Sequence, residues 1–161
     1  MKVDDLYNYI HTFIVKSETF FDNINLSRTE SVDGRWMDRD GLQILNPYKG
    51  IYVFSDHGEN VLYVGKAHYG SIHDRVWGHL KTPSSERNNS ITRDNINIYI
   101  NHQWKNDNIV DLAFIDLIEK GEFKIHGFII QPKEIVSLIE AFALMIIWKM
   151  DNNLPKLNKS F

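Results

Sequence analysis

The sequence predicts an α+β fold, in which helices pack on a small sheet. Residues 49–67, KGIYVFSDHGENVLYVGKA, hold two apolar runs on either side of a polar turn, which is the pattern of a β-hairpin. Residues 131–150, QPKEIVSLIEAFALMIIWKM, carry a proline near their start and are followed by NNLP, as expected of a helix. Three further apolar runs, INIYI, VDLAFIDLI and EFKIHGFII, are typical of strands.

The remaining elements follow in chain order. Apolar side chains recur at helical spacing over residues 3–24, which predicts an N-terminal helix. Residues 25–41, NLSRTESVDGRWMDRDG, are polar and predict a loop. We expect a short helix near residues 71–81 and a polar loop, TPSSERNNSITRDN, after it.

Composition limits what kind of protein this chain can be. Its 161 residues fit one domain, large enough to bury a core without cross-links. The absence of cysteine excludes disulfides and thiolate metal sites and is typical of a reducing cytoplasm. No apolar stretch approaches the roughly 20 residues of a membrane span, and the N-terminus lacks the pattern of a signal peptide. We therefore expect a soluble, cytoplasmic protein.

Charge is distributed unevenly along the chain. The net charge of −3 argues against an indiscriminate binder of nucleic acids. Residues 1–47 carry five Lys/Arg against eight Asp/Glu, whereas residues 61–105 carry six against three and hold four histidines. The middle of the chain is the more plausible surface for an anion, although ordinary surface charge also accounts for this pattern.

The hairpin carries one tyrosine on each strand. Any loop of even length centred on His57 and Gly58 places Tyr52 directly opposite Tyr63, on one face of the sheet. Two phenols would then project together. Taken alone, a cross-strand aromatic pair in a core explains this placement as well, and an odd-length loop or a bulge would break the register.

Cationic side chains follow the second tyrosine. Gly65 permits close approach of a backbone or ligand at the end of the strand, and Lys66 places a point charge beside the phenols. Arg75 and His79 lie four residues apart and share one face of the short helix. Solvated surface is the ordinary explanation for such a pair.

Glu140 is an anomaly in its helix. Between residues 135 and 148 the only polar side chains are Ser137 and Glu140. A carboxylate in so apolar a helix is desolvated unless a cation or metal ion pairs with it. A buried salt bridge, an exposed strip of the helix and a metal ligand are the three alternatives.

Taken together, these residues resemble the GIY-YIG nucleases. Gly50-Ile51-Tyr52 matches the first motif of that family, and Tyr63-Val64-Gly65, within LYVGKA, matches the second with valine at its centre. The resemblance covers residues 49 to about 158, and it extends to four further residues in the family's order: Arg75, His79, Glu140 and Asn158.

Two departures from the family pattern bear on these positions. The stretch between Gly65 and Arg75 is slightly longer than in relatives with LYVGKA. Eighteen residues separate Glu140 from Asn158, where about a dozen is commoner, which makes Asn152 a competing candidate for the terminal asparagine.

The resemblance implies a fold and a domain organisation. It implies a three-stranded sheet, mixed or antiparallel, flanked by helices, in a nuclease domain at residues 48–161. Residues 1–47 form an N-terminal helical arm and loop that is not independent, and residues 82–108 form an insertion. The appended segments would select the target, and we expect that no DNA-binding domain follows.

The implied reaction is hydrolysis of phosphodiester bonds in double-stranded DNA by water, with one Mg²⁺ or Mn²⁺ per active site. Tyr52 would act as general base, directly or through His79, and Tyr63 would position the water. Lys66 and Arg75 would supply the positive field that acidifies a phenol, and Arg75 would also hold phosphate oxygens. Glu140 would hold the metal ion, because hard cations prefer oxygen ligands.

The implied partner is DNA. Candidate DNA contacts beyond the core are Lys81, Arg87 and Arg93. We expect a compact, stand-alone nuclease of restriction type, which as a homodimer could cut both strands. A mobile-element or phage nuclease and a structure-selective repair nuclease come next. A non-catalytic DNA-binding or assembly protein that keeps the fold is the alternative from another class, and the complete set of candidate residues argues against it.

Overall fold

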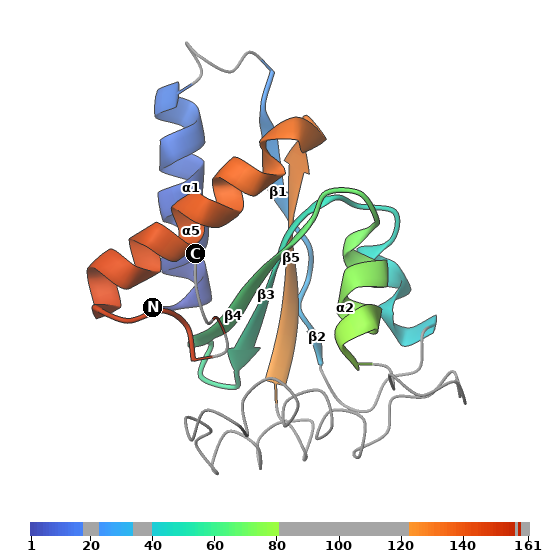
Figure 1. The fold of residues 1–161 in the computed structure, drawn as a ribbon. Coiled ribbons are helices and arrows are strands. Elements are labelled where there is room, and N and C mark those ends of the chain that lie inside the picture. The colour runs from blue at the N-terminus through green and yellow to red at the C-terminus, as the bar shows by residue number, and fades with distance from the viewer. Residues whose placement is uncertain (18–22, 34–39, 81–122, 157, 159–161) are drawn as a thin grey trace.

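A computed structural model describes residues 1–17, 23–33, 40–80, 123–156 and 158. Its regular elements confirm the α+β prediction (Figure 1). The helices are α1 (Val3–Ser17), the 3₁₀ helix η1 (Asp40–Leu45), α2 (Ile72–Leu80), the 3₁₀ helix η3 (Lys133–Ile135) and α5 (Val136–Asp151). The strands are β1 (Asn25–Arg28), β2 (Val32–Asp33), β3 (Gly50–Asp56), β4 (Val61–Ala67) and β5 (Phe123–Gln131).

The sheet is larger than the three strands that the resemblance implies. Its order is β1-β5-β3-β4, and β2 pairs with β5 beyond the end of β1. All these pairings are antiparallel. Within the described residues β4 is therefore an edge strand, and β3 lies between β4 and β5.

The two additional strands come from residues 25–41, for which a loop is predicted; for residues 25–28 and 32–33 that prediction is wrong. β1 alternates exposed and half-buried side chains, so its polar residues face water while its backbone pairs with β5. Thr29 continues the pairing, because its N–H donates to the carbonyl of Gly127 at 2.8 Å. Hydrogen bonds to a strand about a hundred residues away give these polar residues extended structure, and their own sequence carries little sign of it.

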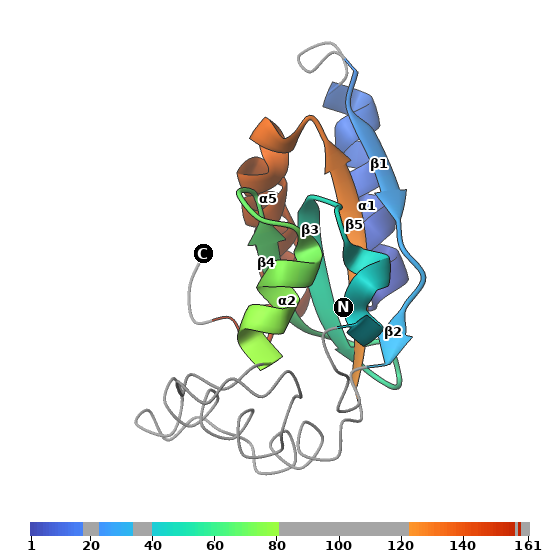
Figure 2. The ribbon, with the colours of Figure 1, turned by 90° about the vertical axis from the view of Figure 1, so that its right-hand side faces the viewer.

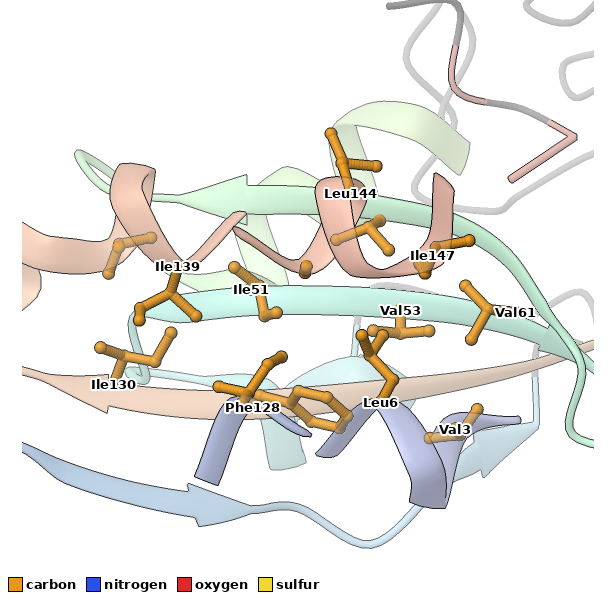
Figure 3. Packing of buried hydrophobic residues seen from close by; sticks show 14 of the residues in the cluster. Val3, Leu6, Ile51, Val53, Val61, Phe128, Ile130, Ile139, Leu144 and Ile147 are labelled. Carbon is orange, nitrogen blue, oxygen red and sulfur yellow. The ribbon is translucent and has the colours of Figure 1, made fainter. Parts of the chain in front are cut away.

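Helices cover the two faces of the sheet (Figures 1 and 2). α1 and α5 pack on one face, where the large hydrophobic cluster lies between them and the sheet (Figure 3). Leu6 of α1 and Ile139 of α5 belong to this one cluster, so α1 is part of the core of the domain. α2 and η1 pack together on the opposite face of the sheet, which we call the face of α2.

Several predicted elements are confirmed. The hairpin is β3 and β4, EFKIHGFII is β5, and the two later helices are α2 and η3–α5. The runs INIYI and VDLAFIDLI and the insertion at 82–108 lie outside the described residues. Among the helices that the structure describes, none has the length and apolar character needed to cross a bilayer.

Candidate active site

The two tyrosines are not directly opposite each other, so the register predicted for the hairpin is wrong. β3 and β4 pair Tyr52 with Gly65 and Phe54 with Tyr63. The turn has three residues instead of an even number: Glu59 N–H donates to the carbonyl of Asp56, and Glu59 adopts φ 62°. A type I turn followed by a left-handed residue closes three-residue hairpin loops in this way.

A bulge shifts the register by a further residue. Ser55 pairs with Val61 while Phe54 pairs with Tyr63, so Leu62 is the extra residue on β4. The two shifts together make Tyr52 and Tyr63 diagonal neighbours on the same face of the sheet. Their ring centroids are 5.9 Å apart, at an interplanar angle of 38°. The phenols are therefore adjacent, as the chemistry expected of them requires, although by a different register.

The tyrosines belong to an aromatic cluster on the face of α2. Phe54 lies 5.8 Å from Tyr52 and 5.5 Å from Tyr63, measured between ring centroids. Tyr52 is only 1% exposed, whereas Tyr63 is half-buried. The pair is therefore compatible both with aromatic packing in a core and with phenols that act in a reaction. Because Tyr63 is the more exposed of the two, water reaches it more readily than Tyr52.

A glycine makes room for Tyr52 on the neighbouring strand β4. Tyr52 pairs with Gly65 on β4 and with Gly127 on β5. A Cβ atom on Gly65 would lie 2.5 Å from the Tyr52 hydroxyl and 2.7 Å from Cε1 of Tyr63. Only glycine at position 65 lets the phenol of Tyr52 lie across β4, which gives the second glycine of the motif its physical reason.

Gly50, the first glycine of the motif, is required for another reason. Its φ is 148°, and a Cβ atom there would overlap the backbone carbonyl of Phe128. Gly50 thus permits the close approach of β3 to β5, the pairing that fixes Tyr52 in the sheet.

Arg75 lies on α2, whose start is fixed by hydrogen bonds. The hydroxyl of Ser71 accepts from the N–H of Asp74 at 3.1 Å, and the Asp74 carboxylate accepts from the N–H of Ser71 at 3.4 Å. This reciprocal pair is a capping box. Partial burial opposes the effect, but hydrogen bonds from Ser71 and His73 lower the pKa of Asp74 below its ordinary value.

The Arg75 side chain is exposed, and within the described residues its guanidinium has no hydrogen-bond or ion-pair partner. A guanidinium in this setting is available to a phosphate. The side chain of His79 lies outside the part of the chain that the structure describes, so its shared face with Arg75 stays a prediction.

Lys66 and Glu140 form an ion pair at 2.7 Å. The Glu140 side chain is 18% exposed and that of Lys66 is 44% exposed. Of the three alternatives for Glu140, the salt bridge is therefore present, although more open to solvent than a fully buried one. Lys66 pairs with Ile51, so it lies on the face of α5, opposite the face that carries the tyrosines. The tyrosines thus lie on one face of the sheet and the Lys66–Glu140 pair on the other, with β4 contributing to both.

Glu140 could offer its carboxylate to a metal ion at this place. Among the described side chains, no three His, Asp or Glu residues converge. Mg²⁺ commonly binds through one or two carboxylates and takes its other ligands from water and substrate phosphates. Glu140 alone fits that mode of binding.

Asn158 is bound to the edge of β4. Its side-chain amide accepts from the N–H of Val64 at 2.9 Å and donates to the carbonyl of Val64 at 2.8 Å. The amide thus completes the pairing of the edge strand between Tyr63 and Gly65. Asn152 instead ends α5 with φ 55° and is exposed, so of the two candidates Asn158 is the one at the site.

A buried polar pair that the sequence does not predict lies on the face of α1 and α5. The hydroxyl of Ser55 and Nε2 of His126 are 2.8 Å apart, and both residues are 0% exposed. Burial, together with the charge of Arg28, lowers the pKa of His126 to about 4. Because water does not reach either side chain, we assign the pair a structural role.

The proposed DNA contacts Lys81, Arg87 and Arg93 lie outside the described residues. Tyr52 and Tyr63 are neighbours on β3 and β4, Asn158 binds the edge of β4, and Arg75 lies on α2, which packs against these two strands. Lys66 and Glu140 reach β4 from the other face. No model of a known family, no curated protein and no solved structure matches this chain.

Proposed function

We propose that this protein is a metal-dependent endonuclease of the GIY-YIG type, which hydrolyses phosphodiester bonds of double-stranded DNA. The observation that carries the proposal is the pair of tyrosines packed over Gly65, with the exposed Arg75 on the next helix. The two phenols leave no room for a side chain at Gly65, so the resemblance at this position has a packing reason as well as a sequence match. It supports a site built to hold those phenols in one arrangement.

The exposures of the tyrosines support Tyr63 as the general base. A base must reach the water that attacks phosphorus, and Tyr63 is half-buried whereas Tyr52 is 1% exposed. Tyr52, on the neighbouring strand β3, then orients Tyr63. This exchanges the roles that the sequence alone favours for the two residues.

Cations are needed for this chemistry. A phenol with an ordinary pKa near 10 is a weak base at neutral pH, and neighbouring positive charge favours its ionised form. Arg75, on the helix that packs on the face of the tyrosines, is the candidate for this charge, because Lys66 lies on the opposite face of the sheet and pairs with Glu140. The planar fork of Arg75 also matches two phosphate oxygens and neutralises charge on the transferring phosphoryl group.

Glu140 would hold one Mg²⁺ or Mn²⁺, which supplies a Lewis acid for the phosphoryl oxygens and the leaving group. In the described structure the Lys66 ammonium holds the Glu140 carboxylate at 2.7 Å and orients it toward β4. Asn158 keeps the backbone of Val64 in place between Tyr63 and Gly65. Lys66 and Asn158 are therefore positioning residues of the site.

The substrate would lie along the edge of β4, where the candidate groups on the two faces of the sheet come nearest to each other in the sequence of the strand. Lys81, Arg87 and Arg93 follow α2 in the chain and stay candidate contacts to the flanking DNA from their sequence alone. We propose a restriction-type enzyme that acts as a homodimer in the cytoplasm, with each copy cutting one strand.

Two observations favour a second function. The Lys66 ammonium satisfies Glu140 without a metal ion, and Tyr52 is buried in an aromatic cluster. A non-catalytic protein that keeps this fold and binds DNA would have the same contacts. The two functions differ in whether DNA is cut.

A plasmid-nicking assay with Mg²⁺ or Mn²⁺ separates them. Wild-type protein nicks supercoiled plasmid, EDTA abolishes the nicking, and Glu140→Ala abolishes it as well. Glu134→Ala, which removes an exposed carboxylate from η3, is the matched control and keeps full activity. No nicking by the wild type on any duplex substrate with either metal, or full nicking by Glu140→Ala, contradicts the proposal.

A further inference from the structure

Tyr69 is exposed to an unusual degree. Its side chain is 92% accessible to solvent, whereas the other exposed large hydrophobic residues of the described chain lie between 40% and 55%. It belongs to the loop between β4 and α2 (Figure 1). Single exposed apolar side chains are ordinary, so the exposure matters only together with the way the residue is held.

The loop that carries Tyr69 is fixed at its backbone. The Lys49 ammonium donates to the carbonyl of Tyr69 at 2.7 Å and to that of His68 at 3.4 Å. The N–H of Ile72 donates to the carbonyl of Tyr48 at 2.8 Å, which ties the far end of the loop to the same segment before β3. A loop anchored at both ends holds its side chains in one place.

The ring of Tyr69 is also fixed. It stacks on the ring of His68, with centroids 4.7 Å apart and an interplanar angle of 26°. His68 is itself half-buried and so offers a firm support. The result is a pre-positioned aromatic surface that remains open to solvent.

The position of this ring connects it with the candidate active site. Tyr69 follows the second motif on the segment that leads directly into α2 and to Arg75. An exposed, pre-positioned aromatic ring on the segment that leads to an exposed guanidinium is suited to binding an unstacked nucleobase near a phosphate. A fully paired duplex offers no such base in its interior.

We propose that Tyr69, supported by His68, is a stacking platform for an unpaired nucleobase of the DNA substrate. The proposal rests on the proposed nuclease function, and it narrows the substrate class to duplexes in which a nucleotide beside the cleaved phosphate is unpaired or extruded. Lys49 is a positioning residue for the platform, since it acts through the backbone of the loop.

The test uses the full chain in EDTA, so that binding is measured without cleavage. The probes are a duplex with a single bulged 2-aminopurine and the same duplex fully paired. The wild type binds the bulged duplex more tightly and quenches its fluorescence through stacking. Tyr69→Ala weakens that binding about tenfold and abolishes the quenching, whereas Tyr69→Phe, which keeps the ring, stays within about twofold of the wild type.

Two further variants complete the design. Lys49→Met keeps Tyr69 but releases its loop, so both quenching and affinity fall. Tyr9→Ala removes an exposed tyrosine from α1, on the other face of the sheet, and leaves both unchanged. Equal unfolding midpoints of Tyr69→Ala and wild type show that the fold is intact.

The outcomes separate the two proposals. If the wild type nicks DNA but Tyr69→Ala binds the bulged duplex as the wild type does, the platform is wrong and the nuclease function stands. If Tyr69→Ala binds as the wild type does yet loses a protein partner, the ring serves protein recognition and the platform is overturned. If the wild type neither binds nor cuts any DNA, both proposals fail.

Discussion

The hydroxyl of Tyr52 lies so close above Gly65 that a Cβ atom at position 65 would be 2.5 Å from it. Real Cβ atoms essentially never come this close to another atom. Because Tyr52 is buried between its neighbours, its ring has little room to move aside. The motif glycine and the motif tyrosine therefore define each other's positions, although they lie on different strands.

Gly65→Ala tests this relationship. The added methyl group displaces both phenols, so we expect a loss of stability of about 1–3 kcal/mol, typical of overpacking, and a larger loss of nicking activity. Urea unfolding and the plasmid assay measure the two effects. Gly70→Ala is the control, because its methyl group makes only ordinary contact with Asp74, 3.7 Å away. Wild-type stability and activity in Gly65→Ala would show that the packing is not restrictive.

Asn158 protects the edge of β4. Asn158→Asp keeps the shape of the side chain but replaces its donor with an oxygen that faces the Val64 carbonyl. At neutral pH we expect a loss of about 1–3 kcal/mol and faster hydrogen exchange of the Val64 N–H, measured by NMR. Asn153→Ala, an exposed change in the preceding turn, should leave that exchange rate as it is. Unchanged exchange in Asn158→Asp would contradict the described contact.

Lys66 and Glu140 should be energetically coupled. Lys66→Met leaves a mostly buried carboxylate without its cation, and Glu140→Gln leaves the ammonium without its anion. We expect each single variant to lose stability and the double variant to lose less than their sum, with a coupling energy of about 1 kcal/mol because the pair is partly exposed. A double-mutant cycle from urea unfolding gives this number. Strict additivity would mean that the ion pair contributes nothing.

Buried His126 makes stability depend on pH. The unfolded chain protonates this histidine below about pH 6.5, whereas the folded chain keeps it neutral down to about pH 4. The free energy of unfolding therefore decreases as the pH falls from about 6.5 to about 4, by about 2 kcal/mol at pH 5 from this group alone. An NMR titration should show no protonation of His126 between pH 7 and 5. Protonation near pH 6.5 in the folded protein would contradict the burial.

The pH effect has a control of its own. His126→Gln removes the titrating group, so the decrease in stability between pH 7 and 5 should become smaller by the same amount. A variant whose stability follows that of the wild type over this range would assign the pH dependence to other groups.

What the sequence could predict follows from the range of the interactions. The hairpin, α2 and α5 depend on local patterns of apolar residues and on turn and capping residues, so they were predictable. The register was not, because the left-handed conformation of Glu59 and the extra residue Leu62 in the bulge leave no clear sign in the pattern of apolar residues. β1 was missed because its polar residues take strand structure only from pairing with β5.

The same distinction holds for the candidate site. The anomaly of Glu140 in an apolar helix predicts some partner, but its identity as Lys66 depends on how α5 packs on β4. Gly65 could be predicted to allow a close approach, whereas the group that approaches, the phenol of Tyr52, follows only from the shifted register. Side-chain exposure, which distinguishes Tyr63 from Tyr52, requires the folded chain.

Single-turnover cleavage by Tyr63→Phe and Tyr52→Phe tests the proposal that Tyr63 activates water for phosphodiester cleavage. We expect Tyr63→Phe to lower the cleavage rate by about 10²–10⁴-fold, the usual contribution of a general base, with DNA binding in EDTA unchanged. Tyr52→Phe keeps the packed ring and should lose less. A cleavage rate of Tyr63→Phe equal to that of the wild type, or a wild type that cuts no DNA, would contradict the account.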